Sequence, residues 1–320
     1  MAISPWSIQL SRGAFEANLA SCLLPLSLAA FLAGKAYSGV ILLAINLFSY
    51  HSARLVSLPV VGLTYIITRF KLNRGILILF ALLVVPTFFS FNSRVSDVGI
   101  WSPTDSWSAV SDRRFESINS GVPDPIARLF SNKAGYLIDE IWSRYSSYYS
   151  PQFLFSSGPA ESTYGMLQGR GVIYLIEVVF ILSFVVMAIR FPGKPTLLLL
   201  LLLFLLPIPA SLAKGPGYAA NRAVIMLPVL IIIISSGLVY FLNLFKKQKK
   251  LFVTLLVCTL YLFHFTFFLE DYFIHGPRQL ARGMLFGYRE LFSRALPIAD
   301  TYSAVRVSRS LSEPHIYYAF

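Results

Sequence analysis

The sequence predicts an α-helical polytopic membrane protein with about eight transmembrane helices, a large external loop and the start of a C-terminal external α/β domain. Three observations carry this prediction. Apolar residues make up 56% of the 320 residues and charged residues only 13%, whereas about a quarter of a soluble chain is charged. The mean hydropathy is +0.66. The apolar residues form long uninterrupted stretches, and basic residues gather in alternate loops between them.

This composition excludes a soluble enzyme, a disordered tail and a small secreted domain held by disulfides. In a membrane protein the net charge of +12 reports loop orientation first, and we expect no nucleic-acid partner. The two cysteines, Cys22 and Cys258, lie inside apolar segments and far from any metal-ligand spacing. We expect both to be small apolar packing residues.

A helix needs about 20 residues to cross the hydrocarbon core, and somewhat shorter helices also qualify. The predicted spans, in chain order, are Ala17–Ala33, Gly75–Ser90, Gly171–Ile189, Thr196–Leu212, Ala223–Leu244 and Leu251–Leu269. Between the first two spans lie shorter apolar stretches, Tyr37–Tyr50 and Leu55–Thr68, which form either two short spans or one re-entrant pair. Either arrangement returns the chain to the side it left.

Alternate loops carry ten basic residues and no acidic residue, namely Lys35, Arg69, Lys71, Arg74, Arg190, Lys194, Lys246, Lys247, Lys249 and Lys250. Because positive loops stay inside, we place these loops in the cytoplasm, and the long loop and both termini outside the cell (cytoplasmic) membrane. No export signal precedes the external start, so we expect further spans upstream. The aromatic run at residues 316–320 leads us to expect more chain downstream as well.

By composition the chain divides into four parts. Residues 1–90 hold membrane helices and an external loop with Arg12 and Glu16, and residues 91–170 form a polar external loop. Residues 171–269 hold membrane helices, and residues 270–320 form an incomplete external segment. This last part mixes a helical stretch, Pro277–Arg294, with β-like stretches at Ala304–Val307 and His315–Phe320. In the external loop, aromatic residues around Pro151 should lie against the membrane surface: Tyr145, Tyr148, Tyr149, Phe153 and Phe155.

The most pointed candidate site lies at the entry to the first span. Arg12 and Glu16 are four residues apart, so we expect them to share one helical face. A guanidinium beside a carboxylate at headgroup level suits an anionic phosphate, directly or through a divalent metal ion. The alternative is an interfacial ion pair that anchors the helix end. No zinc spacing, Gly-rich phosphate loop or nucleophile elbow occurs, and no metal ligands are assigned.

Other ionisable residues lie at or inside span ends. Lys214 and Arg222 are external and close to span ends, where each is either a phosphate contact or a snorkelling anchor. Glu177 lies six residues into a predicted span, which makes it a functional candidate unless it reaches the interface and pairs with Arg170. His264, inside the last span, is expected to be a packed or hydrogen-bonded ring rather than a ligand.

Six segments of the sequence occur in an order that matches one family. They are Ser4–Asn18, Tyr50–Arg54, Tyr149–Phe155, Gly171–Glu177, Asn221–Ala223 and Glu313–Tyr318. In this order they resemble bacterial C-type (GT-C) polytopic glycosyltransferases related to protein O-mannosyltransferases and the lipid A aminoarabinose transferase. We call them the six resemblance segments, and together they extend over most of the chain.

The resemblance implies transfer of a sugar from a polyprenyl-phosphate-linked lipid donor to an acceptor, left open here, on the extracytoplasmic side. It implies that Arg12 contacts the donor phosphate and that Glu16 is the second external acid near the reaction centre. Arg222 and Lys214 are further candidate cations, and the second segment adds His51 and Arg54 as candidates. The family's main catalytic carboxylate lies in an earlier loop that this sequence does not contain.

Two other interpretations stay open. A polytopic transporter or lipid flippase would share the composition, but such proteins carry several ionisable groups at mid-membrane and matched broken helices. A catalytically incomplete membrane fragment would also fit, because the main catalytic loop is not in the sequence. The large external segments favour an enzyme. In each case membrane lipids are expected partners, and no cofactor is assigned beyond the divalent ion that the phosphate would accept.

Overall fold

The computed structural model describes residues 2–12, 16–89, 103–160, 166–213, 219–281, 283, 285–299, 301–303 and 305–306. Every regular element in these ranges is a helix, and no β-strand occurs in them. The fold is therefore all-α. The predicted C-terminal α/β domain is not supported, since residues 305–306 are not in a strand and the rest of the two β-like stretches lies outside the described residues.

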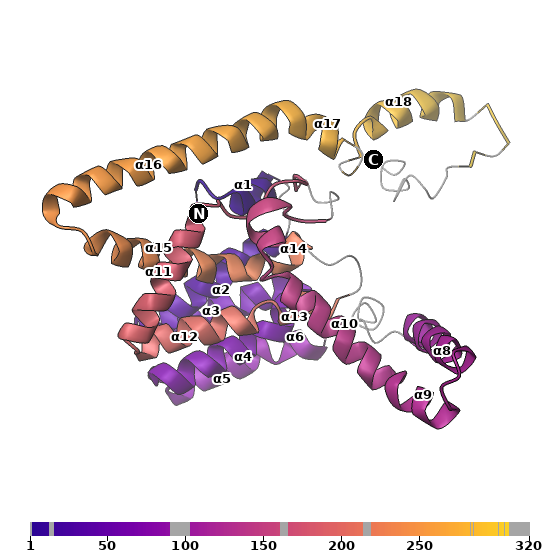
Figure 1. Cartoon of the computed structure of the whole chain (residues 1–320), viewed down its shortest axis with the longest axis horizontal. Coiled ribbons are helices and arrows are strands. Elements are labelled where there is room, and N and C mark those ends of the chain that lie inside the picture. The colour runs from indigo at the N-terminus through magenta and orange to yellow at the C-terminus, as the bar shows by residue number, and fades with distance from the viewer. Residues whose placement is uncertain are drawn as a thin grey trace.

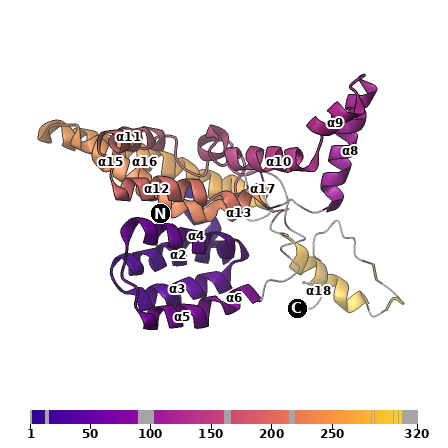
Figure 2. The ribbon, with the colours of Figure 1, turned by 90° about the horizontal axis from the view of Figure 1, so that it is seen from below.

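The N-terminal apolar helices form one group, the lower stack in Figure 2. They are α2 (Glu16–Leu32), α3 (Ala36–Ser49), α4 (His51–Thr68), α5 (Arg74–Val84) and the short α6 (Pro86–Phe89). The turns between them follow from local chemistry. Gly34 adopts a left-handed backbone with φ of 75° after α2, and the Asn73 side chain accepts a hydrogen bond from the Ile76 amide at 2.8 Å, which caps α5.

A second group lies against the first in the same view. It holds α11 (Glu177–Arg190), α12 (Lys194–Leu205), α13 (Ile208–Ser211), α14 (Ala220–Ala223), η2 (Val224–Met226), α15 (Leu227–Asn243) and α16 (Lys247–Glu270). Helices α11 and α15 pack most closely, because Gly237 of α15 lets the two backbones touch. A Cβ atom at Gly237 would lie 1.8 Å from the carbonyl oxygen of Phe180.

The predicted external segments are helical. The loop holds α8 (Pro103–Asn119), α9 (Asp124–Phe130), α10 (Lys133–Ser147) and the π-helix η1 (Gln152–Ser156). In Figure 1, α8 and α9 lie away from the bundle, beyond the N-terminal end of α10. After α16 follow η3 (Asp271–His275), α17 (Gly276–Leu280) and α18 (Tyr288–Ala299), so the helical stretch expected at Pro277–Arg294 is two helices.

Three helical stretches of the described chain are long and apolar enough to cross a membrane: Lys194–Ser211, Ala220–Asn243 and Lys247–Leu280. Their length and composition place the chain among helical membrane proteins. Four further apolar helices have only 10–17 residues, namely Glu16–Leu32, Ala36–Ser49, Ala53–Thr68 and Arg74–Val84. The predicted number of about eight spans is therefore not supported, because most predicted spans form helices shorter than about 20 residues.

Candidate functional site

Helix α1 (Pro5–Arg12) is held by residues from distant parts of the chain. The Trp6 side chain is fully buried, and its Nε1 donates a hydrogen bond to the Ala220 carbonyl at 3.0 Å. Its ring meets Phe153 edge-on, with 5.5 Å between ring centres. The first and third resemblance segments therefore meet at Trp6, next to Ala220, the residue that precedes the fifth.

The fourth resemblance segment joins the same place. The Trp6 amide donates to the Val172 carbonyl at 3.3 Å, and the Tyr174 hydroxyl donates to the Ile3 carbonyl at 2.6 Å. Gln9 is buried, and its Oε1 accepts a hydrogen bond from the Leu167 amide at 2.7 Å. These polar contacts fix α1 in one orientation over residues 166–176, the non-helical segment before α11, which is called the loop from here on.

Two glycines allow that loop to close on itself. A Cβ atom at Gly158, whose φ is 66°, would lie 1.7 Å from the Arg170 carbonyl oxygen. A Cβ atom at Gly171 would lie 2.4 Å from the Leu154 carbonyl oxygen. The Ile173 amide donates to that same Leu154 carbonyl at 3.0 Å. Residues 171–176 are therefore non-helical, and the predicted helical span from Gly171 is wrong over its first six residues.

Five of the six resemblance segments contribute buried side chains to one hydrophobic cluster. Their members in it are Trp6, Leu10, Ala17, Ala53, Phe153, Leu154, Val172, Ile173 and Ala223. The sixth segment, Glu313–Tyr318, lies outside the described residues. We call this assembly the junction. It joins five segments of the chain that are spread over residues 4–223.

Arg12 and Glu16 are both exposed beside the junction. Helix α1 ends at Arg12 and α2 begins at Glu16, and residues 13–15 lie outside the described part of the chain. Whether the two side chains share one helical face stays a prediction. The Arg12 guanidinium lies 5.3 Å from the centre of the Tyr272 ring, a cation–π distance, so α1 contacts η3, the short helix that follows α16.

Arg222 is half-buried in α14, next to Tyr148. Burial raises the pKa of Tyr148 to about 12, although the nearby Arg222 charge and a hydrogen bond to the Ala219 backbone act in the opposite direction. The Tyr148 hydroxyl therefore stays protonated at neutral pH. Lys214 lies outside the described residues, so its predicted role is not tested.

The second resemblance segment supplies structural contacts. Arg54 is buried, and its Nε donates to the Leu47 carbonyl at 2.8 Å. This bond satisfies a carbonyl in the last turn of α3, where helix carbonyls have no partner of their own. His51 is the first residue of α4, and its side chain lies outside the described part of the structure.

Glu177 is the first residue of α11 rather than a residue inside a span. Its Oε2 accepts a hydrogen bond from the Tyr174 amide at 2.9 Å, and its Oε1 accepts one from the Tyr261 hydroxyl at 3.1 Å. The anticipated partner, Arg170, instead forms an ion pair with Asp271. Glu177 thus ties the start of α11 to α16, which is a structural task.

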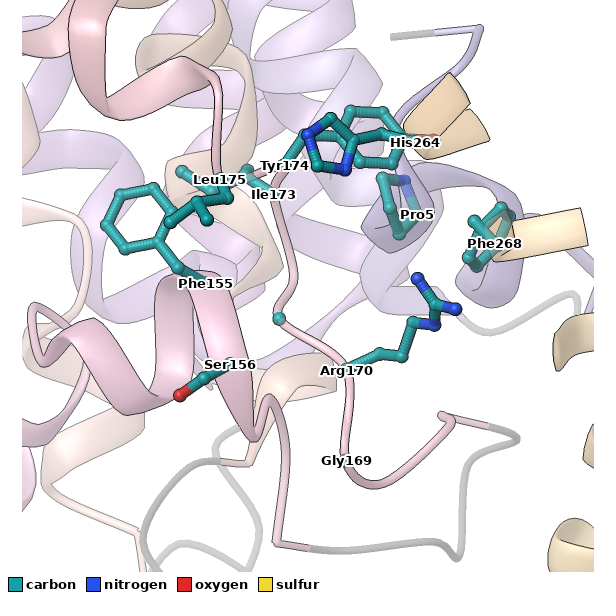
Figure 3. Close-up of a pocket in the computed structure, with 11 residues that line it drawn as sticks. Pro5, Phe155, Ser156, Gly169, Arg170, Ile173, Tyr174, Leu175, His264 and Phe268 are labelled. Carbon is teal, nitrogen blue, oxygen red and sulfur yellow. The ribbon is translucent and has the colours of Figure 1, made fainter. Parts of the chain in front are cut away.

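A pocket of about 240 Å³ opens between α1, the loop and α16. Figure 3 shows its lining, with Pro5 from α1, Arg170 and Tyr174 from the loop, and His264 and Phe268 from α16. The His264 ring stacks on Tyr174, 5.9 Å between centres and 22° between planes, so it is a packed ring as expected. No sequence motif marks this pocket, because its walls come from segments about 100 residues apart.

The predicted membrane-surface position of the aromatic residues around Pro151 is wrong for two of them. Tyr148 and Phe153 are buried in the protein, with rings 5.5 Å apart, because the junction covers them. The Tyr145 and Tyr149 hydroxyls donate to the carbonyls of Phe204 and Leu203, at 2.7 and 2.8 Å. This stretch connects α10 to the end of α12.

One described group of three side chains has metal-ligand atoms within 4.8 Å of one another: Glu270, Asp271 and His275. Its members already have partners. Asp271 pairs with Arg170, and His275 Nε2 lies 3.1 Å from Glu270 Oε1. These ion pairs account for the cluster, so we assign no metal to it.

The all-α fold and the three long apolar helices define a helical membrane protein. Comparisons of the chain with protein-family models, with curated proteins and with solved structures found no match in any of the three.

Proposed function

We propose that this protein is a membrane glycosyltransferase that moves a sugar from a polyprenyl-phosphate-linked donor to an acceptor on the extracytoplasmic side. One observation supports this proposal above the others. Five segments that resemble C-type glycosyltransferases, scattered over more than 200 residues of sequence, converge on one junction with Arg12 exposed beside it. The contacts at Trp6, made by Phe153 and by the Val172 carbonyl, are the specific part of this observation, because the cluster also holds residues from most other helices of the bundle.

The chemistry proposed for the site is a direct displacement. The acceptor hydroxyl oxygen forms a bond to the anomeric carbon as the bond from that carbon to the phosphate oxygen breaks. The acceptor proton passes to a carboxylate acting as general base, and polyprenyl phosphate leaves. Arg12 stabilises the charge that develops on the phosphate, and Glu16 is the external acid next to the reacting centre.

The proposal includes the finer topology. The short apolar helices α2–α5 and α11 cross or enter the bilayer with the three long ones, about eight crossings in all, and the external loop and C-terminus face outward. With Cys22 and Cys258 replaced by alanine, a cysteine at Ser106 should react with an impermeant thiol reagent in intact cells. A cysteine at Gln248 should not. The opposite labelling would contradict the extracytoplasmic site.

The activity is tested with the protein expressed from its whole gene, so that any catalytic loop encoded before Met1 is included, in membranes supplied with a panel of labelled polyprenyl-phosphate hexoses and pentoses. We expect conversion of one donor to free polyprenyl phosphate. Arg12→Ala and Glu16→Gln should each lower the rate by about a hundredfold, the usual loss for one transition-state electrostatic partner. Arg128→Ala, at an exposed arginine of α9, is the matched control and should keep the wild-type rate.

The exchanged pair, Arg12→Glu with Glu16→Arg, separates chemistry from anchoring. If the two residues only anchor a helix end, the exchange is tolerated, since an exposed ion pair contributes about 1 kcal/mol or less. If they serve the phosphate, the exchanged protein is as inactive as either single variant. Intact donor that crosses the bilayer without losing its sugar would instead identify a flippase and refute the transferase.

A further inference from the structure

The C-terminal helices α17 and α18, with the residues that join them, contain more arginines than acids. Residues 276–299 contain four arginines and one glutamate. The arginines are Arg278, Arg282, Arg289 and Arg294. Because four arginines face a single glutamate, the segment has a net positive charge. Such a segment attracts anionic surfaces.

Within this segment α18 places its polar and apolar residues on opposite faces, apart from Pro297, which lies on the polar face. At about 100° per residue, its apolar side chains fall on one face. They are Tyr288, Leu291, Phe292, Ala295, Leu296, Ile298 and Ala299. Glu290 and Ser293 occupy the opposite face, and Arg289 and Arg294 lie at the two borders between the faces. Long basic side chains at these borders can keep their charge in the headgroup region while their stems lie along apolar surface.

The apolar face of α18 is only partly covered by protein. Phe292 is buried, whereas Leu291 and Ile298 are 47% and 55% exposed. Phe286, two residues before the helix, is 82% exposed. Figures 1 and 2 both place α18 apart from the stacked helices of the bundle. An apolar face of this kind needs a partner that is itself apolar.

The position of α18 points to the partner. It begins eight residues after Leu280, where the longest candidate span, Lys247–Leu280, ends. A short connection of this kind keeps α18 close to the end of a membrane helix. The nearest large apolar surface with a charged border is the bilayer interface itself.

We propose that α18 lies in the membrane interface and binds anionic lipid headgroups through Arg289 and Arg294, with its apolar face among the acyl chains. The proposal does not depend on the glycosyltransferase activity. It assigns to the C-terminal segment a lipid-binding surface that holds the outer end of α16 against the bilayer.

The test uses the full chain in phosphatidylcholine vesicles with and without phosphatidylglycerol. In a background with Cys22 and Cys258 replaced by alanine, a spin label is placed at Ile298→Cys or, as the opposite-face control, at Ser293→Cys. The label at position 298 should be accessible to oxygen and several-fold less accessible to a water-soluble nickel chelate. The label at position 293 should show the reverse, since Ser293 lies on the polar face.

The charged border is tested in the same vesicles. Arg289→Gln with Arg294→Gln should raise nickel access at position 298 several-fold and abolish the effect of phosphatidylglycerol. Arg113→Gln with Arg128→Gln, at exposed arginines of α8 and α9, should change neither value. Nickel access at 298 equal to that at 293 would overturn the proposal, as would a label shielded from both reagents because protein covers it. Insertion that ignores both phosphatidylglycerol and the arginines would overturn the assignment of anionic lipid.

Discussion

Helices α15 and α16 are similar in sequence character and different in surroundings. The spans that contain them have mean hydropathies of 2.6 and 2.1, and both are long enough to cross a bilayer. In the first, Ala220–Asn243, 56% of the apolar window is buried inside the protein, and in the second, Lys247–Leu280, only 11%. Hydropathy shows that the side chains of a helix are apolar, but it does not show whether protein or lipid surrounds them.

The difference lies in what each helix offers to its neighbours. Helix α15 presents Gly237 to the Phe180 backbone, which brings α11 within touching distance. Helix α16 touches the rest of the protein along one seam, which includes Val257, Tyr261, His264 and Phe268. Beyond the seam its large side chains, such as Phe263, are exposed. The comparison teaches that α15 is an internal element and α16 a peripheral one.

The largest effect is expected at Gly237. Gly237→Ala places a methyl group against a backbone carbonyl, so α11 and α15 must separate, at a cost of about 3 kcal/mol or more. Thermal unfolding in detergent should show a large drop in the midpoint or loss of folded protein. Gly62→Ala is the matched control, because nothing lies within 4 Å of its added Cβ in α4. A Gly237→Ala protein as stable as Gly62→Ala would show that the two helices are not in close contact.

The next effect concerns the seam of α16. Phe268 is fully buried and Phe263 is 56% exposed, on the same helix. Phe268→Ala should lower the free energy of unfolding by about 3 kcal/mol, as for other buried phenylalanines. Phe263→Ala should leave stability in detergent almost unchanged. Equal losses for both variants would mean that α16 is covered on both sides, and the distinction from α15 would fail.

The smallest effect is expected for the ion pair that ties α16 to the loop. Arg170 pairs with Asp271, and both side chains are partly exposed, so the pair should contribute about 1 kcal/mol. Arg170→Gln, Asp271→Asn and the double variant form a cycle that isolates this term. The coupling should shrink at high salt because exposed charges are screened. A coupling of zero at low salt would place the two side chains apart in solution.

The sequence predicted the apolar helices well, because hydropathy is a local property. The predicted Ala17–Ala33 agrees with α2 to within one residue at both ends, and the predicted Leu251–Leu269 begins four residues after the start of α16 and ends one residue before its end. It failed where distant contacts decide the conformation. Residues 171–176 are non-helical because Gly171 packs against the Leu154 carbonyl, and nothing near Gly171 in sequence signals this contact.

The site was predictable to a similar extent. The segments that meet at Trp6 were identified from the sequence. Their contact in space was not predicted, because a resemblance in sequence gives no distances between segments. The pocket and the Arg170–Asp271 pair escaped detection because their members are separated by about 100 residues. Arg54, a candidate from sequence, is a helix cap, because a buried guanidinium finds its partner in the backbone. Which residue is structural depends on its neighbours in space.

The most direct test of the contrast between α15 and α16 is lipid photolabelling of the wild-type protein. The full chain is reconstituted with a phospholipid that carries a diazirine in its acyl chain, irradiated and mapped by mass spectrometry. We predict labels on the exposed face of α16, at residues such as Leu262, Phe263 and Phe267, and none at Ile233 and Ile234 of α15. Equal labelling of the two helices, or labels on α15 with none on α16, would contradict the account.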